Sequence, residues 1–146
     1  MTKPTLTAEA LLADFPPAVR AIAGKVRAIV LDVLPDAEER VLPGWRALGY
    51  RSKEAGHVCA LFPYAAEVKL YFEHGSSLRD GEGIEYGDTP LTRYAIFRRA
   101  SDVKARTLAP AVMQAFLATS ERRAVRRGAA KPKRRSGRLR RGGGAR

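Results

Sequence analysis

The feature that most constrains the fold is a series of short extended segments joined by short connections. Within residues 67–99, Val68, Leu70 and Phe72 alternate with more polar residues, a period of two typical of a strand with one buried face. Four further segments have strand character, and they span 38–42, 45–51, 57–64 and 92–99. Apart from the glycine-rich residues 74–90, the connections are too short for parallel crossovers, which need a dozen or more residues. They therefore favour antiparallel pairing.

Helical patterns flank the strands on both sides. Residues 7–13 begin with a threonine that can serve as an N-cap, and in 17–34 apolar side chains recur every three or four positions. After the strands we expect a helix over 103–120, with a break near Leu108, because Pro110 cannot donate a backbone hydrogen bond and clashes with the preceding turn. The order predicts an α+β fold: an antiparallel sheet of about five strands with the N- and C-terminal helices packed on it.

Charge is distributed unevenly along the chain. The 146 residues include 27 Lys and Arg against 15 Asp and Glu, a net charge of +12. Residues 121–146 hold nearly all of the excess, whereas residues 1–120 are almost neutral. The C-terminal segment has very few large apolar residues, so it cannot bury enough surface to offset the entropy lost on ordering. The sequence therefore predicts a folded domain over 1–120 and a disordered basic tail over 121–146.

The single cysteine, Cys59, excludes an intrachain disulfide and suits a reducing compartment. It lies in the apolar run 58–62, which favours a buried structural thiol over a reactive one. No apolar run approaches the ~20 residues that span a bilayer. The N-terminus also lacks the basic start and continuous apolar stretch of a signal peptide. We therefore expect a soluble cytoplasmic protein without a membrane span.

Residues for familiar catalytic machinery are few. His57 and His74 are the only histidines, and no serine lies in a nucleophile-elbow pattern. Two histidines and one cysteine are too few for a Cys/His metal cluster. The Gly-Glu-Gly sequence at 81–83 lacks the lysine of a phosphate-binding loop. The sequence therefore predicts a non-enzymatic binding protein.

A ligand pocket on the sheet is the first candidate site. Lys69 and Tyr71 share one face of a predicted strand, and a meander would bring other aromatic and basic residues beside them. Rings together with a cation can hold a planar anionic ligand by stacking and charge-assisted hydrogen bonds. The candidate pocket residues are Trp45, Tyr50, Lys69, Tyr71 and Arg93. The alternative is structural: the two residues from the 45–51 strand pack in the core or at an edge, and Lys69 pairs with a glutamate at 67 or 73.

The basic tail is the second candidate site. Its cations can neutralise phosphates and release counterions, which gives salt-dependent nucleic-acid binding with little sequence preference. The tail has no aromatic residues, so readout of bases is not expected from it. Anionic membrane surfaces and acidic proteins fit the same charge, and a solvated extension without function is the remaining alternative. The tail residues concerned are Arg122, Arg123, Arg126, Arg127, Lys131, Lys133, Arg134, Arg135, Arg138, Arg140 and Arg141.

Four motifs resemble one known family. They are PGWRALGY at 43–50, VKLYFEHGSSLRD at 68–80, GIEYG at 83–87 and TRYAIF at 92–97. They are similar to the YdhG-like domain family of small bacterial proteins, some of which are described as frataxin-like iron chaperones. The resemblance covers about residues 10–117. It departs at Gly81, where we expect a proline, and at Pro90, where we expect a lysine. It implies a compact domain with a twisted antiparallel sheet and flanking helices.

This resemblance makes iron the candidate cofactor. An iron donor needs exposed oxygen ligands that release the metal, and the densest acids are Asp32, Asp36, Glu38 and Glu39. The alternative is a solvated helix end and turn, since Arg40 lies next to them. We therefore expect a small-ligand or iron-binding module of the YdhG-like type. A nucleic-acid-associated accessory protein acting through the basic tail is the alternative.

Overall fold

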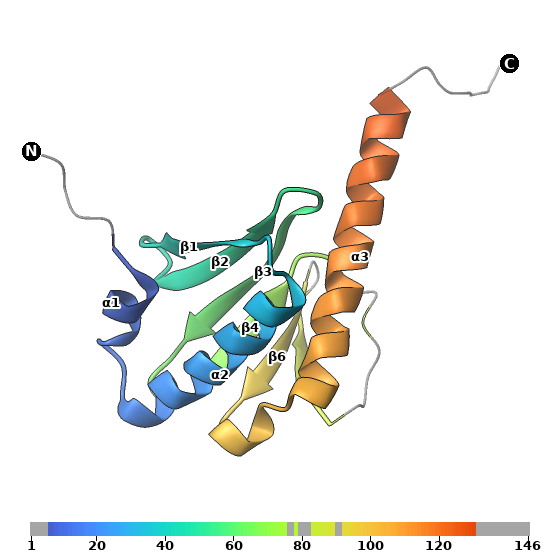
Figure 1. The fold of residues 1–146 in the computed structure, drawn as a ribbon. Coiled ribbons are helices and arrows are strands. Elements are labelled where there is room, and N and C mark those ends of the chain that lie inside the picture. The colour runs from blue at the N-terminus through green and yellow to red at the C-terminus, as the bar shows by residue number, and fades with distance from the viewer. Residues whose placement is uncertain (1–5, 76–77, 79–82, 90–91, 131–146) are drawn as a thin grey trace, which may run out of the picture.

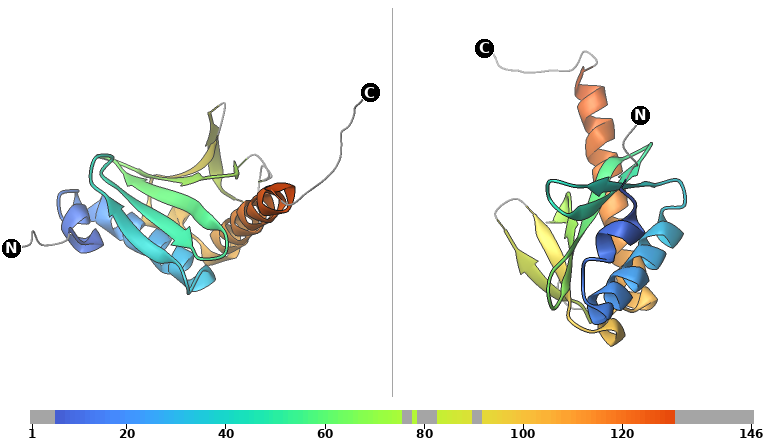
Figure 2. Two further views of the ribbon diagram at one scale, coloured as in Figure 1. Left: turned by 90° about the horizontal axis from the view of Figure 1, so that it is seen from above. Right: turned by 90° about the vertical axis from the view of Figure 1, so that its left-hand side faces the viewer.

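The computed structural model describes residues 6–75, 78, 83–89 and 92–130. Residues 129 and 130 are described by their backbone alone. The antiparallel sheet has the strand order β1-β2-β3-β4-β6-β5, and the helices lie on one of its faces (Figures 1 and 2). The elements are α1 (Ala8–Leu12), α2 (Pro17–Val33), β1 (Glu38–Leu42), β2 (Ala47–Ser52), β3 (Gly56–Pro63), β4 (Val68–Phe72), β5 (Glu85–Asp88), β6 (Arg93–Phe97), the 3₁₀ turn η2 (Ala100–Asp102) and α3 (Ala105–Ala130). The predicted α+β fold is confirmed.

The sheet has one strand more than the sequence indicated. Strand β5 lies inside the glycine-rich segment and pairs antiparallel with β6 at the edge of the sheet. Gly87 of β5 is opposite Tyr94, and a Cβ atom at Gly87 would collide with the Tyr94 ring. Glycine at this position therefore lets the ring lie directly over the edge strand. Because β5 pairs outside β6, strands β4 and β6 become neighbours.

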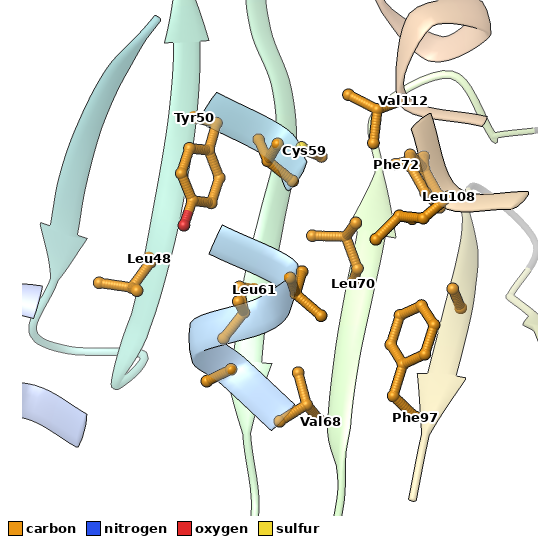
Figure 3. Packing of buried hydrophobic residues seen from close by; sticks show 14 of the residues in the cluster. Leu48, Tyr50, Cys59, Leu61, Val68, Leu70, Phe72, Phe97, Leu108 and Val112 are labelled. Atoms are coloured by element: carbon orange, nitrogen blue, oxygen red, sulfur yellow. The ribbon is translucent and has the colours of Figure 1, made fainter. Parts of the chain in front are cut away.

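The core lies between the sheet and the helices. Alternate residues of the strands point toward the helices, so a period of two in the sequence becomes one continuous apolar layer (Figure 3). Cys59 is fully buried in it, and burial raises the pKa of its thiol to about 12, as expected for a structural cysteine. Other members of this layer are Ile22, Val26, Val30, Leu48, Tyr50, Leu61, Val68, Leu70, Phe72, Phe97, Leu108 and Val112.

Helix α3 is continuous, so the break predicted near Leu108 was wrong. Pro110 lies inside the helix and removes one hydrogen bond, the one that the carbonyl of Arg106 would accept. Arg106 is exposed, so water can take the place of the missing donor. Leu108 and Val112 are both fully buried on either side of the proline. Their packing against the sheet offsets the cost of the proline.

The helix also continues past the predicted domain boundary. Residues 121–130 belong to α3, which corrects the expectation of disorder for this part of the tail. Extending an existing helix costs far less than nucleating one, and Arg and Ala are good helix formers. The Arg123 guanidinium anchors the extension by donating to the carbonyl of Lys53 at 3.3 Å. Residues 131–146, with the remaining tail cations, lie outside the described residues. Over the ranges that the structure covers, no helix has the length and apolar character needed to cross a membrane.

Candidate functional site

The predicted pocket residues are divided between the two faces of the sheet. Tyr50 and Arg93 point toward the helices and are buried, whereas Lys69 and Tyr71 lie on the open face. In the register of β4 and β6, Tyr71 is opposite Tyr94 and Arg93 is opposite Phe72. Tyr94 therefore takes the place beside Tyr71 that Arg93 was expected to fill. The five residues do not converge on a single cavity.

Tyr50 belongs to a partly buried polar network beneath β1. Its hydroxyl donates to the Glu39 carboxylate at 2.6 Å, and the same carboxylate accepts from the Arg27 guanidinium at 2.9 Å. Burial by itself raises the pKa of Glu39, but the hydrogen bonds from Arg27 and Tyr50 outweigh it and hold the pKa below the ordinary 4.5. Burial raises the pKa of Tyr50 in turn. Tyr50 is therefore a core residue, as the structural alternative predicted.

The Glu39 network makes folding stability depend on pH. Because the pKa of Glu39 is lower in the folded state than in the unfolded state, its contribution is complete above about pH 5 and is lost as pH falls through the folded-state value. In urea denaturation from pH 7 to pH 3, the wild type should exceed Glu39→Gln in free energy of unfolding at neutral pH. The difference should shrink on acidification, since a protonated Glu39 resembles glutamine. A difference that stays constant with pH would contradict this assignment.

Arg93 joins the edge strand to the sheet. Its guanidinium lies 4.5 Å from the centroid of the Tyr86 ring, and its Nε atom is 3.1 Å from the Asp88 carboxylate. The same group donates a hydrogen bond to the carbonyl of Leu78. These contacts hold β5 and Leu78 against β6. Arg93 therefore has a structural role on the covered face.

The four predicted iron ligands do not assemble into a site. Glu38 pairs with Arg40 at 3.0 Å, and Glu39 is bound by Arg27 and Tyr50. Asp32 on α2 and Asp36 in the following turn are both exposed. Within the described residues, no group of three or more His, Cys, Asp or Glu side chains could hold a metal ion.

The open face of the sheet carries a row of aromatic rings. We call Trp45, Phe62, Tyr71 and Tyr94 the aromatic stripe. The rings of Trp45 and Phe62 are 6.0 Å apart between centroids, those of Phe62 and Tyr71 5.0 Å, and those of Tyr71 and Tyr94 4.7 Å. These values lie in the range of tilted and edge-to-face aromatic contacts. The stripe therefore runs without a gap from the β1–β2 turn to β6.

Lys69 lies beside the aromatic stripe. Its ammonium is 5.0 Å from the centroid of the Tyr94 ring and 5.2 Å from that of Tyr64. It is also 3.7 Å from the Glu67 carboxylate, the pairing that the structural alternative predicted. A cation over two ring faces is favourable by about 0.5–1 kcal/mol per contact at an exposed site. Lys69 thus packs its ammonium against two rings of the open face while Glu67 compensates its charge.

A second feature lies where α3 extends beyond the sheet (Figure 1). Arg122, Arg123, Arg126 and Arg127 occupy two successive turns, and we call them the arginine cluster. No carboxylate of the described residues lies within ion-pair distance of these four. Three of the four side chains are exposed, and Arg123 is half-buried.

The arginine cluster borders a cavity at the ends of the strands. This strand-end cavity has a volume of about 300 Å³. Burial lowers the pKa of His57, and burial together with Arg122 lowers that of His74, so both imidazoles are mostly neutral at pH 7. The polar residues that line the cavity are Arg51, His57, Glu73, His74, Thr119, Arg123 and Arg126.

Sequence reasoning missed several of these residues. Phe62 was considered only as part of the apolar run 58–62, and Tyr94 was passed over in favour of its neighbour Arg93. Strand alternation over 93–97 places Tyr94 on the face opposite Ala95 and Phe97, and this is the signal that could have found Tyr94. No local pattern brings the two histidines together with α3, because that juxtaposition depends on the tertiary fold.

Fold and site together define a class: an α+β domain with helices on one face of an antiparallel sheet, an aromatic stripe on the other and an arginine cluster on its last helix. Comparison of the chain with protein-family models, with curated proteins and with solved structures finds no match in any of the three. The resemblance to the YdhG-like family therefore stays a prediction.

Proposed function

We propose that this protein is a non-enzymatic nucleic-acid-binding domain that holds a phosphate backbone on the arginine cluster and at the strand-end cavity. The observation that carries this proposal is the arginine cluster itself: four cations within six residues of a helix that extends beyond the sheet, without an acidic partner among the described residues. Clustered arginines that have no carboxylate to compensate their charge are suited to bind a polyanion.

The spacing of the cluster supports this function. Arg122 and Arg126 are four residues apart, as are Arg123 and Arg127, so like charges are neighbours on the helix surface. Such pairs repel each other and slightly destabilise the helix. Phosphates placed between them would remove the repulsion and release condensed counterions. Binding of nucleic acid should therefore stabilise the end of α3.

The strand-end cavity adds donors to the same surface. Arg51 contributes a further guanidinium from the end of β2, and the imidazoles can also donate to phosphate oxygens. Glu73 lies in the same cavity and repels phosphate, so the arginines must supply the excess positive charge. The net balance of the lining side chains is positive, with three arginines against one glutamate.

Two nucleophilic side chains among the described residues, Cys59 and Ser52, have structural roles, which fits binding rather than covalent catalysis. The Cys59 thiol is fully buried, with its pKa raised to about 12 by desolvation, so it carries no reactive thiolate. The hydroxyl oxygen of Ser52 accepts backbone hydrogen bonds from Glu54 and Ala55, both at 3.1 Å, and so stabilises the β2–β3 turn. Neither group is poised to attack a ligand in the cavity.

Titration of the full chain against labelled oligonucleotides tests the proposal. We expect saturable binding of a 20-nucleotide strand in fluorescence anisotropy, with an affinity that falls steeply from 50 to 300 mM salt. Sedimentation with phosphatidylserine vesicles is the matched comparison, because anionic lipid offers the same charge without nucleotides. No saturable binding of the oligonucleotide, or stronger retention on the vesicles, would contradict a nucleic-acid function.

A further inference from the structure

We propose that the open face of the sheet is a stacking platform for the bases of single-stranded nucleic acid. This inference rests on the proposed function and specifies its ligand. The arginine cluster can hold the backbone of any nucleic acid, but only unpaired bases can present their flat faces to protein side chains. The aromatic stripe and Tyr64 would receive those bases.

The rings are exposed to a degree that packing alone does not explain. Trp45 is 72% exposed and Tyr64 is 39% exposed, although each could bury a large apolar area. The same face holds the half-buried rings of Phe62, Tyr71 and Tyr94. Two exposed rings that adjoin three half-buried ones on a single face favour an interaction site over scattered surface residues.

The stripe is held in place by the sheet. Phe62, Tyr71 and Tyr94 come from three adjacent strands, so backbone hydrogen bonds fix their spacing. Neighbouring rings are tilted or edge-to-face and 4.7–6.0 Å apart. Rings prepositioned in this way lose little conformational entropy when a ligand stacks on them. Every base has a π-face, so such a surface tolerates any sequence.

The strand-end cavity with its arginines lies close to the aromatic stripe, and this proximity favours nucleic acid as the ligand of the open face. Glu73 of the strand-end cavity follows Tyr71 by two residues, which is about 7 Å along an extended chain. His57 lines the same cavity, and its Cε1 atom is 3.6 Å from where a Cβ of Gly49 would lie. Gly49 pairs with Ala60, which in turn pairs with Tyr71. The strand-end cavity therefore lies next to the Tyr71 part of the aromatic stripe.

The arginine cluster and the aromatic stripe together match one class of ligand. A strand whose phosphates contact the arginine cluster can turn its bases onto the aromatic stripe. A duplex can use the arginines but conceals its base faces in the stack. An apolar partner would use the rings but not the arginines. Single-stranded nucleic acid uses both surfaces.

Trp45 makes the inference directly measurable, since it is the only tryptophan of the chain. We expect a 15-nucleotide thymidine strand to quench its fluorescence at saturation, and a duplex of equal length to bind without quenching. Tyr64→Ala should weaken binding of the single strand about 5- to 150-fold and leave duplex affinity unchanged. Leu117→Ala is the matched control, because Leu117 is 56% exposed on α3 and lies outside both surfaces; it should bind like the wild type.

The outcomes separate this inference from the proposed function. If neither oligonucleotide binds, both the proposed function and the stacking platform are refuted. If both bind equally, Trp45 fluorescence is unchanged and Tyr64→Ala binds like the wild type, the arginine surface stands and the platform is refuted. A Trp45 signal that depends on protein concentration alone would assign the open face to a second copy of the chain, and would also overturn the inference.

Discussion

Replacing the four residues of the arginine cluster with glutamine should reduce nucleic-acid affinity about 10²- to 10³-fold at 0.1 M salt. The quadruple variant is Arg122→Gln, Arg123→Gln, Arg126→Gln and Arg127→Gln. Each phosphate contact releases about 0.7 to 0.9 counterions, so the slope of log affinity against log salt should become shallower by about three. Glutamine is also a good helix former, so α3 should remain helical although the hydrogen bond from Arg123 to the carbonyl of Lys53 is lost. Anisotropy titrations at several salt concentrations measure both quantities.

A second quadruple variant controls for total charge. It replaces four exposed cations outside the strand-end cavity with glutamine: Arg20, Arg40, Lys104 and Arg106. The control variant therefore loses as many positive charges as the first variant, but at other positions. If general attraction to a positive chain drives binding, both variants should lose affinity equally. We expect the control to retain most of the wild-type affinity and slope, because the effect depends on where the charges lie. Equal losses would refute the assignment of the site to α3.

Phe72→Ala should lower the free energy of unfolding by about 3–5 kcal/mol, the second large effect we expect. Phe72 has no exposed surface, and it lies on the covered face of β4 close to Leu108 and Val112 of α3 (Figure 3). Truncating it would remove a buried ring and leave a cavity between the sheet and the helix. Urea denaturation followed by circular dichroism measures the loss.

Phe62→Ala is the matched substitution on the other face. The same ring is removed, but Phe62 is half-buried and contacts only Trp45 and Tyr71 among the aromatic rings of the described residues. We expect a loss of about 1–2 kcal/mol, since water already reaches the site and no closed cavity forms. Losses of equal size in the two variants would show that the open face is as well packed as the core, which would contradict the two-faced sheet.

The fold was largely readable from residue patterns. The apolar stripe of α2, the alternation in β4 and the short connections each depend on neighbouring residues, and each led to the correct element. Strand β5 was not readable, because its glycine and acidic residues resemble a turn and only pairing with β6 makes it a strand. The course of α3 past Pro110 likewise depends on burial against the sheet.

The site was readable only in part. Trp45, Lys69 and Tyr71 lie on the same open face, and strand alternation with a meander suffices to predict that much. Arg93 was placed on the wrong face, because the register between β4 and β6 depends on a partner strand, and a shift of one residue exchanges the faces. Tyr50 was a plausible ligand contact by residue type. Its actual role depends on a hydrogen bond to Glu39, which a strand pattern does not reveal.

The two outer strands determine how the molecule meets copies of itself. Strand β1 has five residues and β5 has four, and both carry exposed charged side chains, including Glu38, Arg40, Glu85 and Asp88. A free strand edge offers unpaired amides and carbonyls to another chain, and short, charged edges discourage such addition. Polymerisation by successive strand pairing is therefore disfavoured at both ends of the sheet. Crowded copies of the protein can remain separate while their ring-bearing faces stay available to a different kind of molecule.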